Sequence, residues 1–286
     1  MTTKTALDLA PLSPAIGVEV RDVNIRDVDD DLFRDIEKAW SDHAVLLFRN
    51  QTLSKDDQTA FSRRFGPLQP APNNTVGRPW LSDFPEIAVM SNIRENGAVI
   101  GSLGSGEAIW HSDMSYIDEP PSASLLYSLE IPDEGGDTGF ANMYDAHDTL
   151  PDSLKSWIEG RAINHDASRD SSDGLRKGFD TVDDPRTAPG ERHPIVRTHP
   201  VTGRKALFLG RRRNAWVVDS PLDESEALLD ELWAHATQPS LHWHHKWAVG
   251  DLLVWDNRCT LHRRDSFDDK ARRLLHRTQI RGDRPY

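Results

Sequence analysis

Hydrophobic residues recur along this chain in the two rhythms that mark strands and helices. Residues 16–20 and 241–247 alternate apolar and polar positions, as a strand with one buried face does. Short apolar runs predict further strands at residues 44–48, 87–90, 122–129, 194–197, 206–209, 252–255 and 274–280. Strands are therefore expected over the whole length of the chain.

Apolar residues at helical spacing predict helices at residues 29–43, between Ser54 and Gly66, and at residues 146–158 and 223–235. Ser54 and Asp57 have the spacing of a capping box. Ala60, Phe61 and Phe65 would form the buried side of the helix that follows. Pro151 either interrupts the third helix or opens a second one.

The segments between these elements are rich in turn-forming residues. Residues 67–86 contain many prolines, residues 95–107 many glycines, and residues 166–193 many Asp, Arg, Gly and Pro. Residues 95–107 form either a lid over a site or an ordinary surface loop. Since no repeat or linker divides the chain, we expect one domain over residues 1–286. Its class is mainly β with flanking helices, around a jelly-roll (double-stranded β-helix) core whose mouth holds a pocket.

Composition narrows the possible functions. The 286 residues include 34 Lys and Arg against 46 Asp and Glu, and the net charge of −12 argues against a nucleic-acid binder but not against a small anionic substrate. Cys259 is the single cysteine, so an internal disulfide is impossible and a reducing compartment is expected. No apolar run is long enough to span a membrane, and residues 1–10 lack a signal-peptide core, so we expect a cytoplasmic protein.

A candidate metal site begins at Trp110-His111-Ser112-Asp113. On a strand, His111 and Asp113 point to the same face because side chains alternate. An imidazole and a carboxylate are two of the three ligands in the 2-His-1-carboxylate set that binds non-heme Fe(II). His262 is the leading candidate for the third ligand. Because the chain has 12 histidines, the alternative is a strand histidine hydrogen-bonded to a carboxylate.

His242, His244 and His245 form a second and denser histidine group. His242 and His244 share a strand face and have the spacing of a possible zinc site. They lie among two tryptophans and a lysine, without a carboxylate nearby in the sequence. We therefore interpret them as strand residues that pack against a helix.

Arg273 and Arg277 lie four residues apart at the strand predicted over residues 274–280, so their side chains are expected on one face. If that face points into the barrel, two buried cations require anionic partners. The same run offers no acid, so two small-molecule anions would satisfy both arginines. The alternative is that both face solvent and pair with surface acids.

These motifs together resemble the Fe(II)- and 2-oxoglutarate-dependent dioxygenases of the taurine dioxygenase/2,4-D dioxygenase (TauD/TfdA) family. The matching residues follow the family's order across nearly the whole chain. They are Trp110-His111-Ser112-Asp113, Pro120-Pro121, Gly135-Gly136-Asp137-Thr138, Thr198-His199-Pro200-Val201-Thr202-Gly203, Trp255-Asp256-Asn257-Arg258, His262, Arg273 and Arg277.

The resemblance implies roles for the matching residues. His111, Asp113 and His262 match the family's iron ligands. Thr138 and Arg273 match the groups that bind the distal carboxylate of 2-oxoglutarate, Arg273 through a bidentate fork.

Three further positions receive weaker or different expectations. Arg277 matches an arginine that in family members faces the acidic group of the substrate. Trp255 is expected to pack near the iron, where self-oxidation of its ring is a weaker hypothesis. His199 is given no catalytic role.

The resemblance also implies a reaction. With Fe(II) as cofactor, the enzyme would use O2 to decarboxylate 2-oxoglutarate to succinate and CO2 while hydroxylating a small organic acid. If the hydroxylated carbon bears an ether oxygen or a sulfonate, the product collapses to a carbonyl compound plus a phenol or sulfite. Relatives often form dimers or tetramers, so a homo-oligomer is expected, with no nucleic-acid or membrane partner.

Two segments bear on the substrate. Taurine enzymes carry a histidine shortly after the Phe-Gly pair, here Phe65-Gly66, but Ala71 occupies the matching position. Residues 250–259 look closer to aryloxyalkanoate dioxygenases. We therefore expect an aryloxyalkanoate such as 2,4-D, with a taurine or alkylsulfonate dioxygenase of the same family as the alternative.

Two other classes stay open on the sequence alone. One is a zinc-dependent hydrolase that uses the same ligands or the pair His242 and His244. The other is a non-catalytic barrel that binds organic acids. Arg273 together with Arg277 favours the dioxygenase, because a hydrolase has no reason to hold two anions.

Overall fold

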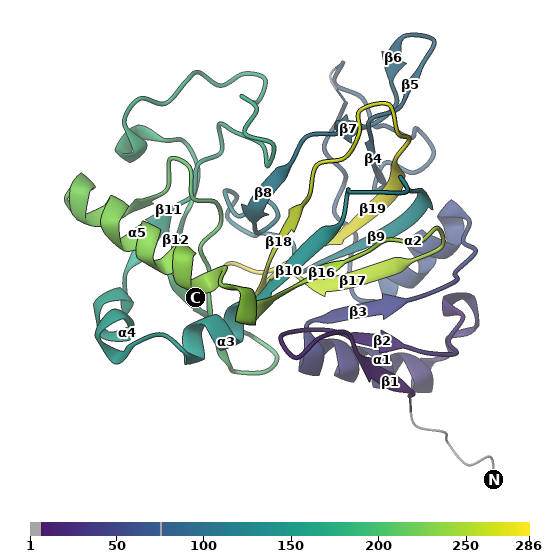
Figure 1. Ribbon diagram of the computed structural model, residues 1–286, viewed down its shortest axis with the longest axis horizontal. Coiled ribbons are helices and arrows are strands. Elements are labelled where there is room, and N and C mark those ends of the chain that lie inside the picture. Colours follow the sequence, from purple (N-terminus) through teal and green to yellow (C-terminus); the bar gives the residue numbers. More distant parts are fainter. Residues whose placement is uncertain (1–6, 75) are drawn as a thin grey trace.

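The computed structural model describes residues 7–74 and 76–286 (Figure 1). The first six residues of the N-terminal segment, for which no signal peptide is expected, lie outside the described residues. Among the described residues, no helix combines the length and the apolar character needed to cross a bilayer.

Two sheets form the centre of the fold. The strand order of the larger sheet is β1 (Leu9–Pro11), β2 (Val18–Val20), β3 (Val45–Phe48), β17 (Leu252–Asp256), β9 (Ala123–Glu130), β19 (Leu274–Ile280), β4 (Ala88–Ser91) and β7 (Ser102–Leu103). The order of the smaller sheet is β16 (His242–His245), β10 (Thr138–Asn142), β18 (Thr260–Arg264) and β8 (Ala108–His111). This arrangement confirms the expected mainly-β class with a jelly-roll core.

The remaining elements flank these sheets (Figure 1). Three strands form a small separate sheet, in the order β12 (Arg192–Pro194), β11 (Ala162–Asn164) and β15 (Trp216–Val217). The two hairpins are β13 (Val196–Thr198) with β14 (Lys205–Leu207), and β5 (Arg94–Glu95) with β6 (Ala98–Val99). The helices are α1 (Asp30–His43), α2 (Lys55–Arg64), α3 (Met143–Asp148), α4 (Asp152–Ile158), α5 (Leu222–Ala236) and the 3-10 turns η1 (Ile25–Asp27), η2 (Pro185–Thr187) and η3 (Pro239–Leu241).

Side-chain alternation along the larger sheet separates two hydrophobic cores. On β17, Trp255 belongs to the core between the two sheets, where its ring centroid lies 5.5 Å from that of Phe140 on β10. Val254 belongs to the second core, which α1 and α2 cover. The central strands of this sheet are therefore buried on both faces, and polar side chains on their inner face require partners inside the barrel.

The capping box of α2 is confirmed, because Ser54 and Asp57 exchange side-chain-to-backbone hydrogen bonds. The prediction for the helix's buried side is wrong at Ala60, which is exposed. Its neighbours Gln58 and Ser62 are buried instead. The amide of Gln58 donates to a backbone carbonyl of β19, and the hydroxyl of Ser62 bonds a threonine hydroxyl on the same strand. Polar residues can therefore replace apolar ones on this face because β19 supplies partners.

Other predictions are corrected in detail. Residues 146–158 belong to two helices, which confirms the alternative in which Pro151 opens a second helix, although Pro151 is the N-cap of α4 and not its first residue. The sequence pattern predicts neither β10 nor β18. For β18 the reason is its run of consecutive polar and charged residues. The segment 95–107 contains β6 and β7, and β7 pairs in parallel with β4, so this part of the chain extends the larger sheet.

Candidate metal centre

Three side chains converge where β8 and β18 pair. His111 and His262 are opposite each other in the register of these strands, and their ring centroids lie 4.1 Å apart. Asp113 Oδ1 lies 3.7 Å from Nε2 of each histidine. One ligand atom from each residue lies within 4.8 Å of the others, and all three residues are buried. The sequence prediction that these three come together is confirmed.

The strand expected to carry both His111 and Asp113 ends earlier than predicted. β8 stops at His111, and Asp113 lies in the turn that follows. Asn257 fixes this turn, since its side chain accepts from the Asp113 amide at 2.7 Å and donates to the Asp113 carbonyl at 3.0 Å. Met114 has a φ of +48°, a conformation uncommon outside glycine. The aspartate is therefore aimed by a constrained turn rather than by strand alternation.

Hydrogen bonds prepare these side chains to bind a cation. His111 Nδ1 lies 2.7 Å from the Ile109 carbonyl, so it carries the proton and leaves Nε2 as a lone-pair donor. Asp113 Oδ2 accepts from Ser124 Oγ at 2.9 Å. Two imidazole nitrogens and a carboxylate oxygen with open space beside them match the donor set of a facial Fe(II) site.

The electrostatics of the group favour the protonation states that a metal needs. Burial first, and then His111, hold the pKa of His262 well below its usual range, so this imidazole is neutral. Burial alone would raise the pKa of Asp113, but the charge of Arg277 opposes burial, and that pKa lies well below its usual range. Two neutral imidazoles and one carboxylate are the ligating forms.

A narrow cavity, called the inner cavity here, opens beside the three side chains. Its lining includes His111, His262, Thr138, Arg264, Arg273 and Arg277. Arg273 is 3% exposed and donates to the Gly136 carbonyl at 3.2 Å, and no carboxylate in the described part of the chain pairs with it. Burial, together with Arg264, lowers the pKa of Arg273 to about 9. A buried guanidinium in this state requires an anionic ligand.

Two neighbours make the inner cavity more selective for an anion. Thr138 Oγ1 accepts from the indole of Trp247 at 3.0 Å, so its own hydrogen is free to donate into the cavity. Arg264 is buried and donates to the backbone carbonyls of Leu103 and Gly106, and no carboxylate of the described residues pairs with it. Sequence reasoning missed Arg264, because a charged residue on an unpredicted strand gives no sign of burial.

A second, wider space of about 540 Å³, called the outer pocket here, reaches the metal group at Asp113. Arg277 lines both spaces and donates to Asp113 Oδ1 at 2.9 Å. Of the two alternatives for Arg273 and Arg277, the inward-facing one is confirmed, but the expectation that a small-molecule anion satisfies each is wrong for Arg277, because Asp113 is its partner. The role of Arg277 toward a substrate stays a prediction.

Arg211 is the residue of the outer pocket that sequence reasoning missed. Burial lowers the pKa of its guanidinium. It donates to the Arg169 carbonyl, and no carboxylate of the described residues forms an ion pair with it. Its charge lies 5.5 Å from the ring centroid of Tyr116, which Arg176 also approaches at 4.4 Å. Arg211 is the first of three consecutive arginines, a pattern that is typical of an exposed charged turn.

The second histidine group does not assemble a metal site. His244 pairs with Asp265 at 3.0 Å, and His245 pairs with Asp251 at 2.9 Å, so carboxylates absent from the local sequence are supplied by other segments. His242 and His244 pack against the ring of Trp110 on β8, so their expected packing against a helix is corrected. Neither belongs to the metal-binding groups found among the described residues.

A separate buried group contains His199, Asp256 and Cys259. Asp256 receives two hydrogen bonds from the Arg258 side chain and one from His199 Nε2 at 2.9 Å. Burial raises the pKa of the Cys259 thiol well above its usual range, so it stays protonated. These groups satisfy one another, and the absence of a catalytic role for His199 stays a prediction. Nearby, Trp255 packs 4.9 Å from the His262 ring and lines the inner cavity, as expected.

Comparison with known proteins gives one consistent result. The family model described as "Taurine catabolism dioxygenase TauD, TfdA family" matches residues 8–279. The chain is 38% identical over 283 residues to an alpha-ketoglutarate-dependent 2,4-dichlorophenoxyacetate dioxygenase of Cupriavidus pinatubonensis, covering 96% of this chain and 97% of that protein. It is 34% identical over 295 residues to an (S)-phenoxypropionate/alpha-ketoglutarate-dioxygenase of Sphingobium herbicidovorans, covering 97% and 96%.

Solved structures agree with this result. The crystal structure of AAD-2 in complex with Mn(II) and N-oxalylglycine matches with a TM-score of 0.80 and 29% identity, over 98% of this chain and 99% of that one. A taurine dioxygenase from Burkholderia xenovorans matches with a TM-score of 0.77 and 30% identity, over 98% of this chain and 91% of that one. With the buried His-Asp-His group and the arginine-lined cavity beside it, these matches establish that the chain belongs to the TauD/TfdA family of Fe(II)- and 2-oxoglutarate-dependent dioxygenases.

Proposed function

We propose that this dioxygenase hydroxylates an aryloxyalkanoate, such as 2,4-D, or a related small aromatic acid. The observation that carries the proposal is the outer pocket. It combines apolar side chains, among them Met90, Leu175 and Phe179, with the partly buried guanidinium of Arg211, which pairs with no carboxylate of the described residues. An aromatic ring next to one acidic group fits this combination. The similarity to 2,4-dichlorophenoxyacetate and phenoxypropionate dioxygenases supports the same class of substrate.

We assign the metal and cosubstrate to the residues around the inner cavity. His111, Asp113 and His262 would hold Fe(II), and Thr138 and Arg273 would bind the distal carboxylate of 2-oxoglutarate. When bound, Fe(II) and 2-oxoglutarate supply the activation of O2. One oxygen atom enters succinate as CO2 leaves, and the other replaces the hydrogen of a substrate C–H bond as a hydroxyl group.

The chain's own contribution is orientation of the substrate. The acid would lie between Arg211 and Arg277, which both line the outer pocket, and the carbon next to it would then face the metal group. Hydroxylation of that carbon in an aryloxyacetate gives a hemiacetal. Loss of the aryloxy group as a phenol then leaves glyoxylate, which balances the reaction.

The test is a substrate screen that scores coupled product. Aryloxyacetates, aryloxypropionates and alkylsulfonates would be incubated with Fe(II) and 2-oxoglutarate, and phenol or sulfite would be measured together with succinate. We expect phenol and succinate in equal amounts from an aryloxy acid. Sulfite from taurine as the best product would instead support the sulfonate alternative, which the loss of the histidine at Ala71 disfavours.

Replacing Arg211 by leucine tests the anchoring of the acid. Loss of a charge-assisted hydrogen bond costs about 1.5–3 kcal/mol, so KM for phenoxyacetate should rise about 10- to 150-fold, while KM for 2-oxoglutarate changes little. Arg213→Leu is the matched control, because Arg213 is exposed and pairs with Asp173. An unchanged KM for phenoxyacetate in Arg211→Leu would contradict this assignment.

Four expectations from the sequence analysis are carried forward as proposals. We propose a homodimer or homotetramer, which analytical ultracentrifugation would test. We also propose a cytoplasmic location and a single functional unit over residues 1–286, with no nucleic-acid partner, as the net charge of −12 supports.

A further inference from the structure

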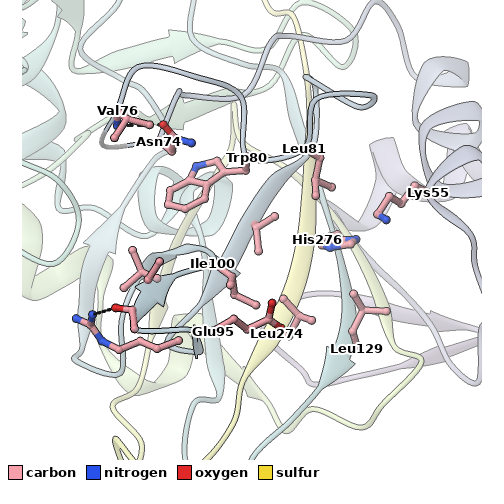
Figure 2. Close-up of a pocket in the computed structure, with 15 residues that line it drawn as sticks. Lys55, Asn74, Val76, Trp80, Leu81, Glu95, Ile100, Leu129, Leu274 and His276 are labelled. Carbon is pink, nitrogen blue, oxygen red and sulfur yellow. Dashed lines mark hydrogen bonds between the residues drawn. The ribbon is translucent and has the colours of Figure 1, made fainter.

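A third pocket, separate from the inner cavity and the outer pocket, is lined by residues of β19, by Lys55 of α2 and by the segment around Trp80 (Figure 2). Its volume is about 840 Å³, and we call it the back pocket. Leu274 and His276 of β19 line it, whereas Arg273 and Arg277 line the inner cavity. Side chains that alternate along one strand therefore face two separate spaces. The back pocket is not part of the metal centre described above.

One edge of the back pocket is built to meet a polar group. Figure 2 shows Lys55 and His276 at this edge, away from Asn74 and Val76. His276 is 8% exposed, and no described residue hydrogen-bonds its ring. Burial, then the charge of Lys55, lowers the pKa of His276 to about 4, so the neutral ring can both donate and accept. Lys55 has no carboxylate partner among the described residues, which leaves one uncompensated positive charge at this edge.

The rest of the back pocket is mainly apolar and partly aromatic, although Asn74, Arg94 and Glu95 also line it. Trp80, Leu81, Ile100 and Leu129 contribute to its wall. Val99, at the open end of the β5–β6 hairpin, is 40% exposed although it lines the same space. A few polar groups at one end of an apolar space of this size are typical of sites for small organic molecules.

We propose that the back pocket is a second binding site for a small aromatic molecule with one acidic oxygen. The ring would lie against Trp80 and the leucines, and the acidic oxygen would face Lys55 and His276. The proposal rests on the proposed function for the choice of ligand, because that reaction supplies two molecules of this chemistry. They are the aryloxy acid itself and the phenol that it releases.

The site has a direct route to catalysis. Asn74 and Trp80 line both the back pocket and the outer pocket, so one segment forms a shared wall. On β4, Val89 faces the back pocket while Ala88 and Met90 face the outer pocket. An occupant that fixes Trp80 changes the shape of the substrate site. The turnover rate, measured against the concentration of the acid or of the phenol, should therefore depart from the saturation curve of a single site at high concentrations.

Fluorine NMR on the anaerobic Fe(II) enzyme with N-oxalylglycine tests the proposal without turnover. The probes are 4-fluorophenoxyacetate and 4-fluorophenol, in separate arms. We expect two bound signals for at least one probe, one strongly broadened by the iron and one less affected. Lys55→Met and Leu129→Trp should each weaken binding of the probe at the back pocket, reported by the second signal, at least tenfold and should leave the first signal unchanged. Arg211→Leu should remove only the first signal. The arm that shows the second signal identifies its source.

Two control variants separate filling of the pocket from general damage. Val249→Trp adds the same side chain at an exposed position outside the pocket, and Lys205→Met removes an exposed lysine on β14. Neither should affect either signal. A second signal that is absent in both arms, or that survives both Lys55→Met and Leu129→Trp, would overturn the proposal.

The same experiment distinguishes other failures. Loss of the iron-broadened signal alone would argue against the proposed substrate and not against the back pocket. If Leu129→Trp changes the sedimentation coefficient and no second signal is seen, the pocket is an interface between copies of the chain, which also overturns the proposal.

Discussion

His111→Ala is expected to reduce succinate formation from 2-oxoglutarate by at least about a hundredfold. The basis is the shared geometry of His111, Asp113 and His262, whose ligand atoms lie within 4.8 Å of one another. Removing a residue that only hydrogen-bonds a metal ligand already lowers metal affinity or activity about 10- to 100-fold. Removing a ligand itself should lower them further. The measurement is succinate released per enzyme with saturating Fe(II), in the presence of phenoxyacetate.

A matched histidine change controls for folding. His43 is exposed in the last turn of α1 and lines neither the inner cavity nor the outer pocket, so His43→Ala should retain wild-type activity. Circular dichroism of His111→Ala should match the wild type, because the ring's hydrogen bond is local to the Ile109 carbonyl. Activity of His111→Ala within threefold of the wild type would rule out this residue as a ligand.

Arg273→Met should raise KM for 2-oxoglutarate about 10- to 150-fold. Arg273 is 3% exposed, and no carboxylate of the described residues compensates its charge, so we infer that the cosubstrate does. A charge-assisted hydrogen bond is worth about 1.5–3 kcal/mol, and a bidentate fork adds geometric selectivity. Arg273→Lys should recover only part of the loss, because lysine keeps the charge without the fork. Initial rates against 2-oxoglutarate concentration give the result.

The neighbouring residue supplies the control for this change. Arg272 is exposed and pairs with Glu130, so Arg272→Met should leave KM for 2-oxoglutarate within twofold of the wild type. Equal KM values for 2-oxoglutarate in Arg273→Met and Arg272→Met would show that the buried Arg273 does not bind the cosubstrate.

The sequence predicted the parts of this site that depend on local pattern and motif. The strand at residues 274–280 was predicted with its observed bounds, and its alternation correctly placed Arg273 and Arg277 toward one space. The joint pattern of motifs also predicts that His111, Asp113 and His262 converge, as they do in the structure.

Other parts of the site depend on long-range topology that no local pattern reports. β18 was missed because its Thr-Leu-His-Arg-Arg sequence is too polar for an ordinary strand, although its inner face supports a polar cavity. Arg264 and Arg211 look like surface residues in the sequence, but distant segments bury Arg264 fully and Arg211 partly. The back pocket forms between α2, the segment around Trp80 and β19, and so required the three-dimensional arrangement.

The central claim is that one iron atom is held by three side chains that the fold brings together. Anaerobic titration with Fe(II) by calorimetry, in the presence of 2-oxoglutarate, tests it most directly on the wild type and on His111→Ala, Asp113→Ala and His262→Ala. We predict one iron bound per wild-type chain and at least a hundredfold weaker binding in each variant. Wild-type affinity in any one of the three variants would contradict the claim.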